Sequence, residues 1–220
     1  MLRYSLAPAL RESEHAPDST IHVFFGLAIK RAIGRQWGGS RFDAYSFILI
    51  ALATLCAWFP IRHALFEERL AEASERFLST DRISVNCLSK FGGIFYLRVA
   101  GFVYRGSDII NLKSSTCEQL QAYLDSPALV DNYTLYSLHV LTHEAMHVAG
   151  EFNESLADCK AFQRNHKMAE QLGVPSLTAA INSRDLHRFR SSRHPYYSAE
   201  CEPGRGMDEG LPDAVWVPSS

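Results

Sequence analysis

The feature that most constrains the fold of this chain is a run of 18 residues without a charge, Ala44–Ile61. A helix of this length is close to the lower limit for crossing a bilayer, and Tyr45 and Trp58 lie where aromatic residues gather at membrane interfaces. The alternative is a core helix of a soluble protein, but such a helix is rarely apolar on every face. The run therefore predicts a single transmembrane helix.

More than forty residues precede this run, which argues against a cleaved signal peptide and favours a retained anchor. We expect residues 1–43 to form a flexible cytoplasmic and juxtamembrane segment. Basic residues near the run give a small excess on its N-terminal side: Lys30, Arg31, Arg35 and Arg41 precede it, whereas Arg62, Arg69 and Arg76 follow it. This excess favours a cytoplasmic N-terminus and an extracytoplasmic domain from residue 62 to residue 220.

Four of the five cysteines follow the predicted span, and the fifth, Cys56, lies inside it. The four are Cys87, Cys117, Cys159 and Cys201. An even set in one region suits two disulfides in an oxidising compartment, which agrees with an exported domain. Three pairings are open, and the alternative is four buried or free thiols.

The charge balance indicates no nucleic-acid partner. The formal net charge is -2, the pI is about 6.5, and the basic residues form no long run. A nucleic-acid interface normally needs a basic patch or stripe. The sequence does not indicate an oligomeric state.

Hydrophobic spacing in the rest of the chain predicts an α+β domain. Apolar residues at helical spacing predict an amphipathic helix over Ala64–Leu78. Alternating and β-branched stretches then predict two to four short strands within Ile83–Cys87, Ile94–Tyr104 and Ile109–Leu112. Start and stop signals predict four further helices: from Ser115 to about Leu124, from Asp131 to Gly150, from Asn153 to about Leu172, and from Leu177 to about Arg190.

The second of these helices carries the sequence His143-Glu144-Ala145-Met146-His147, which is HExxH. One helical turn separates the two histidines, so both imidazoles leave the same face and are able to bind one zinc ion. Glu144 is able to approach the open coordination position, where a carboxylate takes a proton from zinc-bound water. We therefore predict His143 and His147 as metal ligands and Glu144 as the catalytic base.

A catalytic zinc site needs a third protein ligand. Gly150 is suited to end the helix in the left-handed conformation, and Asn153 is suited to cap the next helix. Glu154 would then be the third ligand, and Asp158, one turn later on the same face, would orient a ligand histidine from the second shell. Glu151, Asn153 and Asp158 remain alternatives for the third ligand. Cys159 would ligate only if reduced, and we expect a disulfide there instead, with Cys117 considered as its partner.

The pattern HEAMH followed by NESLAD resembles the zincin metallopeptidases, in particular the gluzincins, in which a glutamate on a following helix completes the zinc site. Only six residues separate His147 from Glu154, far fewer than in typical gluzincins. The run HEAMHVAGEFN also resembles the metzincin motif, with Asn153 where the third ligand would stand. The resemblance covers about residues 102 to 160.

The resemblance implies a minimal zincin-like fold, in which a small sheet packs on the active-site helices. It also implies that an extended substrate adds to a sheet edge, at 102–105 or at 109–112. The predicted function is that of a membrane-anchored zinc-dependent metallopeptidase that hydrolyses a peptide or protein substrate. The alternatives are a zinc-binding module without activity and a metal-free, membrane-anchored interaction domain.

Overall fold

The computed structural model describes residues 41–89, 99–190 and 198–216. The chain divides into two compact units, Met1–Leu55 and Cys56–Ser220, and we describe each by itself. Residues 1–40 lie outside the described part, and so does most of the expected cytoplasmic segment. The predicted strand region Ile94–Tyr104 falls partly on residues that are not described.

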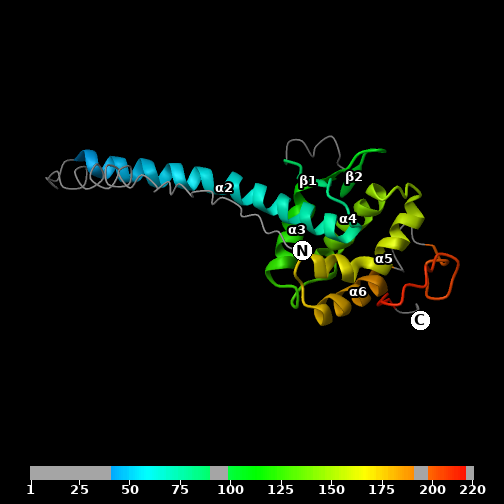
Figure 1. Cartoon of the computed structure of the whole chain (residues 1–220). Coiled ribbons are helices and arrows are strands. Elements are labelled where there is room, and N and C mark those ends of the chain that lie inside the picture. Colours follow the sequence, from blue (N-terminus) through cyan, green and yellow to red (C-terminus); the bar gives the residue numbers. More distant parts are fainter. Residues whose placement is uncertain (1–40, 90–98, 191–197, 217–220) are drawn as a thin grey trace, which may run out of the picture. The chain divides into compact units, whose positions relative to one another are not determined.

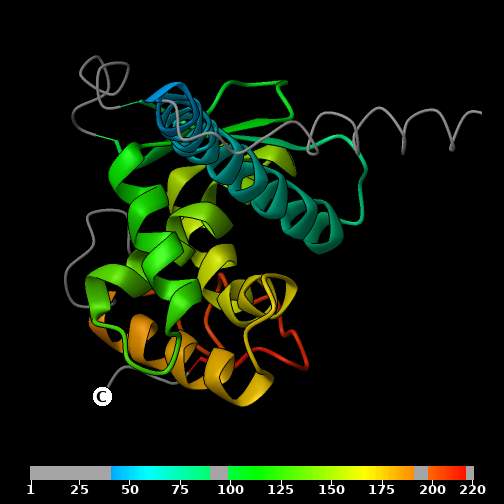
Figure 2. The ribbon, with the colours of Figure 1, turned by 90° about the vertical axis from the view of Figure 1, so that its left-hand side faces the viewer.

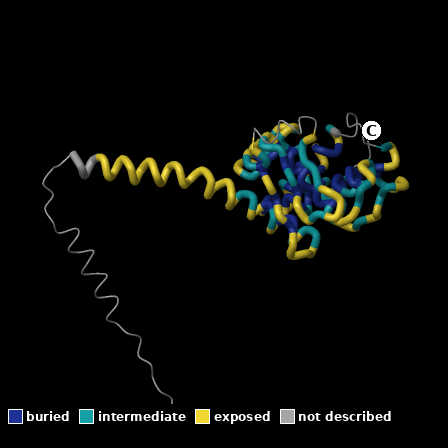
Figure 3. The backbone as a smooth tube through the Cα atoms, turned by 90° about the horizontal axis from the view of Figure 1, so that it is seen from above, coloured by how far each residue is buried: buried dark blue, intermediate teal, exposed yellow. Residues whose placement is uncertain are grey.

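The apolar run lies on a single long helix, α2 (Arg41–Leu78). Among the described residues, this is the one helix long and apolar enough to span a membrane; its most apolar window has a mean hydropathy of 1.7, and none of that window is buried. In Figure 3 this stretch appears as an exposed tube. The predicted helix from Ala64 to Leu78 is confirmed and ends at Leu78, and it continues the apolar run without a break, because no glycine or second proline follows Pro60 to end the helix.

The domain contains a three-stranded sheet of β1 (Ser84–Cys87), β2 (Gly101–Val103) and β3 (Ile109–Leu112) in the order β1-β3-β2. Strand β3 pairs in parallel with β1 and antiparallel with β2. Alternate residues of β1 and β3 are buried, so one face of the sheet lies on the core. Among the described strands β3 is central, and of the two segments considered for substrate addition only β2 lies at an edge.

Four helices follow the sheet: α3 (Ser114–Asp125), α4 (Asn132–Val148), α5 (Glu154–Gln171) and α6 (Ser176–Arg190). Figures 1 and 2 show them packed together, with α4 in contact with α3, α5, α6 and the strands β2 and β3. This mixed architecture confirms the α+β class. Helix α3 begins at Ser114, one residue before the predicted Ser115, and the side chain of the N-cap residue Lys113 makes no capping hydrogen bond.

Two predicted caps are confirmed, at the helix starts of α4 and α5. The Asp131 side chain accepts a hydrogen bond from the Thr134 N–H at 2.8 Å, and the Asn153 side chain accepts one from the Leu156 N–H at 3.1 Å. Each cap satisfies one of the backbone donors that a helix start leaves without an intrahelical acceptor. The sequence therefore predicted where α4 and α5 begin.

The C-terminal half of α2 belongs to the core of the second unit. Leu70 and Ala73 are fully buried, and the Cys87 N–H of β1 donates a 2.6 Å hydrogen bond to Glu67. Arg69 donates at 2.5 Å to the carbonyl of Leu172 at the end of α5. These contacts join the helix end to the sheet and to α5, and the buried residues in Figure 3 gather in this unit.

Two disulfides join parts of the second unit, Cys87–Cys117 and Cys159–Cys201. The pairing of Cys159 with Cys117 was wrong, because Cys117 on α3 faces Cys87 on β1, while Cys159 on α5 faces the C-terminal segment. The exposed Cys56 is free. The two bridges indicate that this unit belongs to an oxidising, extracytoplasmic compartment.

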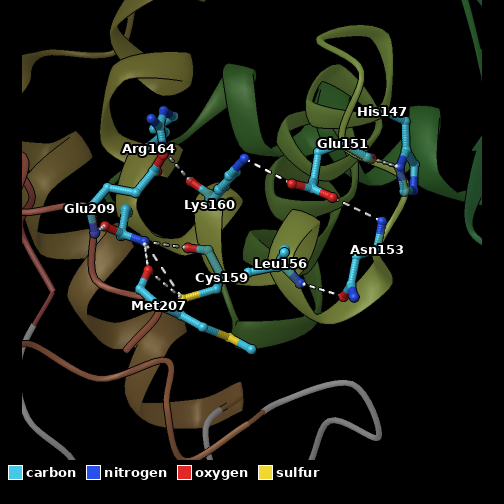
Figure 4. A network of polar contacts seen from close by, with 10 residues as sticks. His147, Glu151, Asn153, Leu156, Cys159, Lys160, Arg164, Met207 and Glu209 are labelled. Carbon is cyan, nitrogen blue, oxygen red and sulfur yellow. Dashed lines mark hydrogen bonds and ion pairs between the residues drawn. The ribbon is translucent and has the colours of Figure 1, made fainter. Parts of the chain in front are cut away.

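The C-terminal segment (residues 198–216) is attached to α5 by more than the disulfide. Gln163 donates to the Met207 carbonyl at 3.1 Å and accepts from the Glu209 N–H at 2.9 Å. Arg164 forms an ion pair with Glu209, and Lys167 forms one with Asp213. Figure 4 shows Arg164 of α5 close to Glu209 of this segment. This segment therefore covers one side of α5, which also packs against α4 and α6.

Candidate metal centre

Helix α4 carries three histidines at successive helical turns, His139, His143 and His147. Side chains four residues apart lie on one face of a helix, one above the other. The three rings accordingly follow one another, with centroids 6.2 Å apart for His139 and His143 and 4.6 Å apart for His143 and His147. The face that they form is turned toward α5.

The turn between α4 and α5 brings the start of α5 back to His147. Gly150 has a φ of +93°, and its N–H donates to the His147 carbonyl at 3.0 Å, while the Glu151 N–H donates to the Met146 carbonyl at 3.0 Å. This pair of bonds ends a helix with a left-handed glycine, as the sequence predicted. The chain reverses within a few residues, so the short link that separates this sequence from typical gluzincins is long enough to return Glu154 to the histidines.

We call His143, His147 and Glu154 the outer donor set. His143 Nε2 lies 3.2 Å from Glu154 Oε2, and His147 Nε2 lies 3.6 Å from Glu154 Oε1. Their ligand atoms all lie within 4.8 Å of one another, so the set could hold a metal ion. The structure thus brings together the three residues that the sequence predicted as metal ligands.

Two contacts orient His147 within this set. Its Nδ1 lies 2.6 Å from the carbonyl oxygen of Glu151, which is only an acceptor, so the ring carries its proton on Nδ1. The Nε2 lone pair is then available on the side of Glu154, as metal ligation requires. The Phe152 ring stacks on the His147 ring with their centroids 5.8 Å apart. The Arg105 guanidinium in turn lies over the Phe152 ring, 4.6 Å from its centroid. The donor set therefore fits a bound cation in its tautomer as well as in its distances.

A second group, the inner network, lies one helical turn deeper and consists of His139, Asp158 and Asn165. His139 Nε2 lies 2.8 Å from Asp158 Oδ1, and His139 Nδ1 lies 3.2 Å from Asn165 Nδ2. Asp158 Oδ1 also lies 3.9 Å from His143 Nδ1. The sequence predicted Asp158 as the residue that orients a ligand histidine. In the structure it lies closest to His139, and His143 is its second, more distant histidine neighbour.

Glu144 is buried beside the outer donor set, with only 5% of its surface exposed. Its Oε2 has no hydrogen-bond partner among the described residues. Burial, and then the charge of Glu154, raises the pKa of Glu144 to about 8. A Cβ added at Gly101 of β2 would lie 3.0 Å from Glu144 Cγ and Oε1. Glu144 therefore occupies space that is open only because residue 101 is a glycine.

These groups share a cavity of about 400 Å³. Its polar wall consists of His139, His143, Glu144, His147, Glu154 and Asp158. The facing wall is formed by residues 99–103, which include β2, and by Tyr136 and Val140 of α4. A cleft with a few convergent polar groups and a carboxyl group of strongly shifted pKa is typical of a binding or catalytic site.

The alternatives for the third ligand are engaged elsewhere. Glu151 forms a 2.9 Å ion pair with Lys160 and accepts from the Asn153 N–H at 3.0 Å (Figure 4). The Asn153 side chain is occupied in capping α5, and Cys159 is held in its disulfide. Among the described residues Glu151 belongs to no group of converging His, Cys, Asp and Glu donors, whereas Asp158, the remaining alternative, belongs to one with His139 and His143.

Sequence reasoning missed His139, which belongs to a second described group that could hold a metal ion, together with His143 and Asp158. The signal was present, because His139 precedes the first motif histidine by one helical turn. Sequence reasoning also missed Gly101, for which the sequence held no signal, since 43 positions separate it from Glu144.

In comparisons with protein-family models, with curated proteins and with solved structures, none matches this chain. The functional inference therefore depends on the geometry of the site. That geometry defines a class of site: two imidazoles and one carboxylate that could hold a metal ion, beside a buried carboxyl group, in an open cleft.

Proposed function

We propose that this chain is a membrane-anchored zinc metallopeptidase of the zincin type, with a gluzincin-like ligand set and a cytoplasmic N-terminus. The observation that carries the proposal is the convergence of His143 and His147 on Glu154, next to the buried Glu144. Two imidazoles and a carboxylate suit zinc, and three protein ligands leave a coordination position for substrate. The disulfides and the single candidate span support an exported domain on an anchor.

Each residue of the site has a separate role in the proposed reaction. His143, His147 and Glu154 would hold the zinc ion, and Asp158 would orient His143. When bound, zinc would supply a Lewis acid for the substrate carbonyl and a positive charge that would lower the pKa of Glu144 and of a nearby water. The Glu144 carboxylate would take a proton from that water while the water oxygen bonds to the peptide carbon and the carbonyl electron pair moves to the carbonyl oxygen. Glu144 would then pass the proton to the amide nitrogen as the carbonyl re-forms and the carbon–nitrogen bond breaks, which leaves a carboxylic acid and an amine.

The sheet edge supplies a route for binding substrate. Strand β2 lies at an edge among the described strands and lines the cavity next to Glu144. An extended peptide is able to pair with such an edge through backbone hydrogen bonds. A bound chain would then pass the catalytic carboxyl group, with its side chains facing Tyr136 and Val140.

The test uses the full-length protein in detergent. Metal analysis should give about one zinc per chain, and incubation with a mixed peptide library should give cleavage products. Glu144→Gln keeps the size of the side chain but is unable to accept the proton, so zinc should remain and the cleavage rate should fall by about 100- to 10,000-fold. Glu151→Gln is the matched control, because this carboxylate lies in the adjacent turn but faces Lys160.

The outcomes separate the alternatives. Folded protein without metal would overturn the proposal and favour a metal-free interaction domain. One zinc per chain without any cleavage by the wild-type protein would favour the zinc-binding module. Cleavage that survives Glu144→Gln would contradict the role of Glu144 as the base.

A further inference from the structure

The inner network is a polar cluster in the most buried part of the α4–α5 contact. His139 and Asp158 are each 1% exposed, and Asn165 is fully buried. The ring of His139 stacks on Phe162 of α5 at a centroid distance of 4.1 Å. Apolar side chains would fill this space without the desolvation that a buried carboxylate requires. The presence of the cluster therefore calls for a function other than packing.

The hydrogen bonds determine how His139 acts on Asp158. The side-chain nitrogen of Asn165 only donates, so His139 Nδ1 accepts and the proton of the ring is on Nε2. This Nε2–H faces Asp158 Oδ1 at 2.8 Å and donates to it. His139 thus holds one carboxylate oxygen of Asp158 in a fixed place between α4 and α5.

That same oxygen is the one that faces His143. Asp158 Oδ1 lies 3.9 Å from His143 Nδ1, while His143 Nε2 lies 3.2 Å from Glu154 on the other side of the ring. At 3.9 Å the contact is longer than a hydrogen bond, so Asp158 acts on the His143 ring through its charge. A carboxylate behind a ligand imidazole favours the ring orientation in which Nδ1 faces it and Nε2 faces the metal. The position of Asp158 therefore affects the nitrogen that faces the outer donor set.

We propose that His139 is a positioning residue of the metal centre, which acts through Asp158 on His143. The inference rests on the proposed metal site. In this arrangement the helix carries two ligand histidines and a third histidine that holds their supporting carboxylate. Asn165 completes the chain of contacts by selecting the tautomer in which His139 donates to Asp158.

The distances alone would also allow His139, His143 and Asp158 to hold a metal ion of their own. Both ring nitrogens of His139 already have partners, and a metal on Nε2 would break the 2.8 Å contact with Asp158. In the outer donor set, by contrast, the His147 Nε2 lone pair is turned toward Glu154. The geometry favours His139 as the donor to Asp158.

The experiment measures zinc affinity in the full-length protein by competition with a chromophoric chelator, together with the visible spectrum of the cobalt-substituted protein. His139→Leu removes the donor, and His139→Gln keeps an N–H where Nε2 lies. His187→Leu is the matched control, because His187 is also 1% exposed and contacts Phe162, but it does not line the cavity. Thermal unfolding of the zinc-free proteins reports the structural cost of each change.

We expect His139→Leu to weaken zinc binding about 10- to 100-fold and to change the cobalt spectrum. His139→Gln should restore most of the affinity. His187→Leu should lower thermal stability and leave the affinity unchanged. Wild-type affinity in His139→Leu would overturn the inference, and so would an equal loss in His187→Leu or no recovery in His139→Gln. Wild-type protein that takes up no metal would overturn both this inference and the proposed function.

Discussion

The outer donor set and the inner network lie on the same two helices, one turn apart, yet they differ in how their polar atoms are used. In the outer set the Glu154 side chain is 49% exposed, whereas the Asp158 side chain in the inner network is 2% exposed. Both groups reach the cavity, but in the inner network both ring nitrogens of His139 have hydrogen-bond partners, whereas in the outer set the two imidazoles converge on the half-exposed Glu154.

This difference shows that the spacing of histidines on a helix does not decide which of them bind metal. Glu154 stands at the first turn of α5, where the helix emerges from the turn after Gly150 and solvent reaches its side chain. Asp158 and Asn165 stand farther along α5, where the helix is packed against α4. The same helix face is therefore able to supply ligands at its open end and support at its buried end.

The largest expected effect comes from removing a donor of the outer set. Glu154→Ala should weaken zinc binding by more than about 100-fold, since the loss of a ligand exceeds the 10- to 100-fold loss that follows from removing a supporting residue. Zinc titration against a chelator measures the change. Glu151→Ala should remain close to the wild type, because that carboxylate pairs with Lys160. Unchanged affinity in Glu154→Ala would remove Glu154 from the outer donor set.

A smaller effect is expected from a substitution that displaces Glu144 and leaves the outer donor set and the inner network unchanged. Gly101→Ala places a Cβ 3.0 Å from Glu144 and 3.1 Å from Leu112 Cδ2, so Glu144 must shift. A displacement of about 1 Å at a catalytic group costs on the order of 100-fold in rate, and the shift required here is smaller. Peptide cleavage should therefore fall by less than about 100-fold while zinc content stays at the wild-type level. A wild-type rate would show that Glu144 tolerates the movement.

The pH dependence of stability isolates the cost of burying Glu144 in the zinc-free protein. The pKa of Glu144 is raised from 4.5 to about 8, so the folded state keeps its proton while the unfolded state loses it. This contribution to stability is fully present below pH 4.5 and is lost as the pH rises toward 8, by about 1.4 kcal/mol per pH unit.

Thermal unfolding of the zinc-free wild type and of Glu144→Gln at about pH 5, 6.5 and 8 checks this expectation, because these values lie between the ordinary pKa of the carboxyl group and its raised pKa. The variant has no such proton, so its stability relative to the wild type should increase with pH. Parallel pH profiles for the two proteins would contradict the burial of Glu144 as the cause.

The smallest effect is expected from removing the N-cap side chains of α4 and α5, of which only the cap of α5 lies beside the outer donor set. Asn153→Ala and Asp131→Ala each remove one side-chain cap and should each lower stability by about 1 kcal/mol. Asn153 directly precedes Glu154, so its replacement should also weaken zinc binding severalfold. Asp131 lies at the far end of α4 and serves as the control. Equal zinc affinity in both variants would mean that the start of α5 does not set the position of Glu154.

Much of the local structure could be predicted from the residues themselves. The helix starts at Asp131 and Asn153 and the left-handed Gly150 are confirmed, because caps and turns depend on side chains within a few positions of the backbone groups that they satisfy. The apolar run and the four disulfide cysteines were also recognised. Both the apolar run and the amphipathic helix that follows it were predicted, and the structure joins them in one helix.

The sequence by itself determined the motif helix, the sharp turn after it and the carboxylate that follows, because each depends on spacing along a few helical turns. Only the tertiary structure decided that Cys159 pairs with Cys201, that β3 is the central strand, and that Gly101 makes room for Glu144. It also decided that His139 faces Asp158 while His143 and His147 face Glu154. Contacts of this kind join positions far apart in the chain, and they form only where helices and strands pack and exclude water.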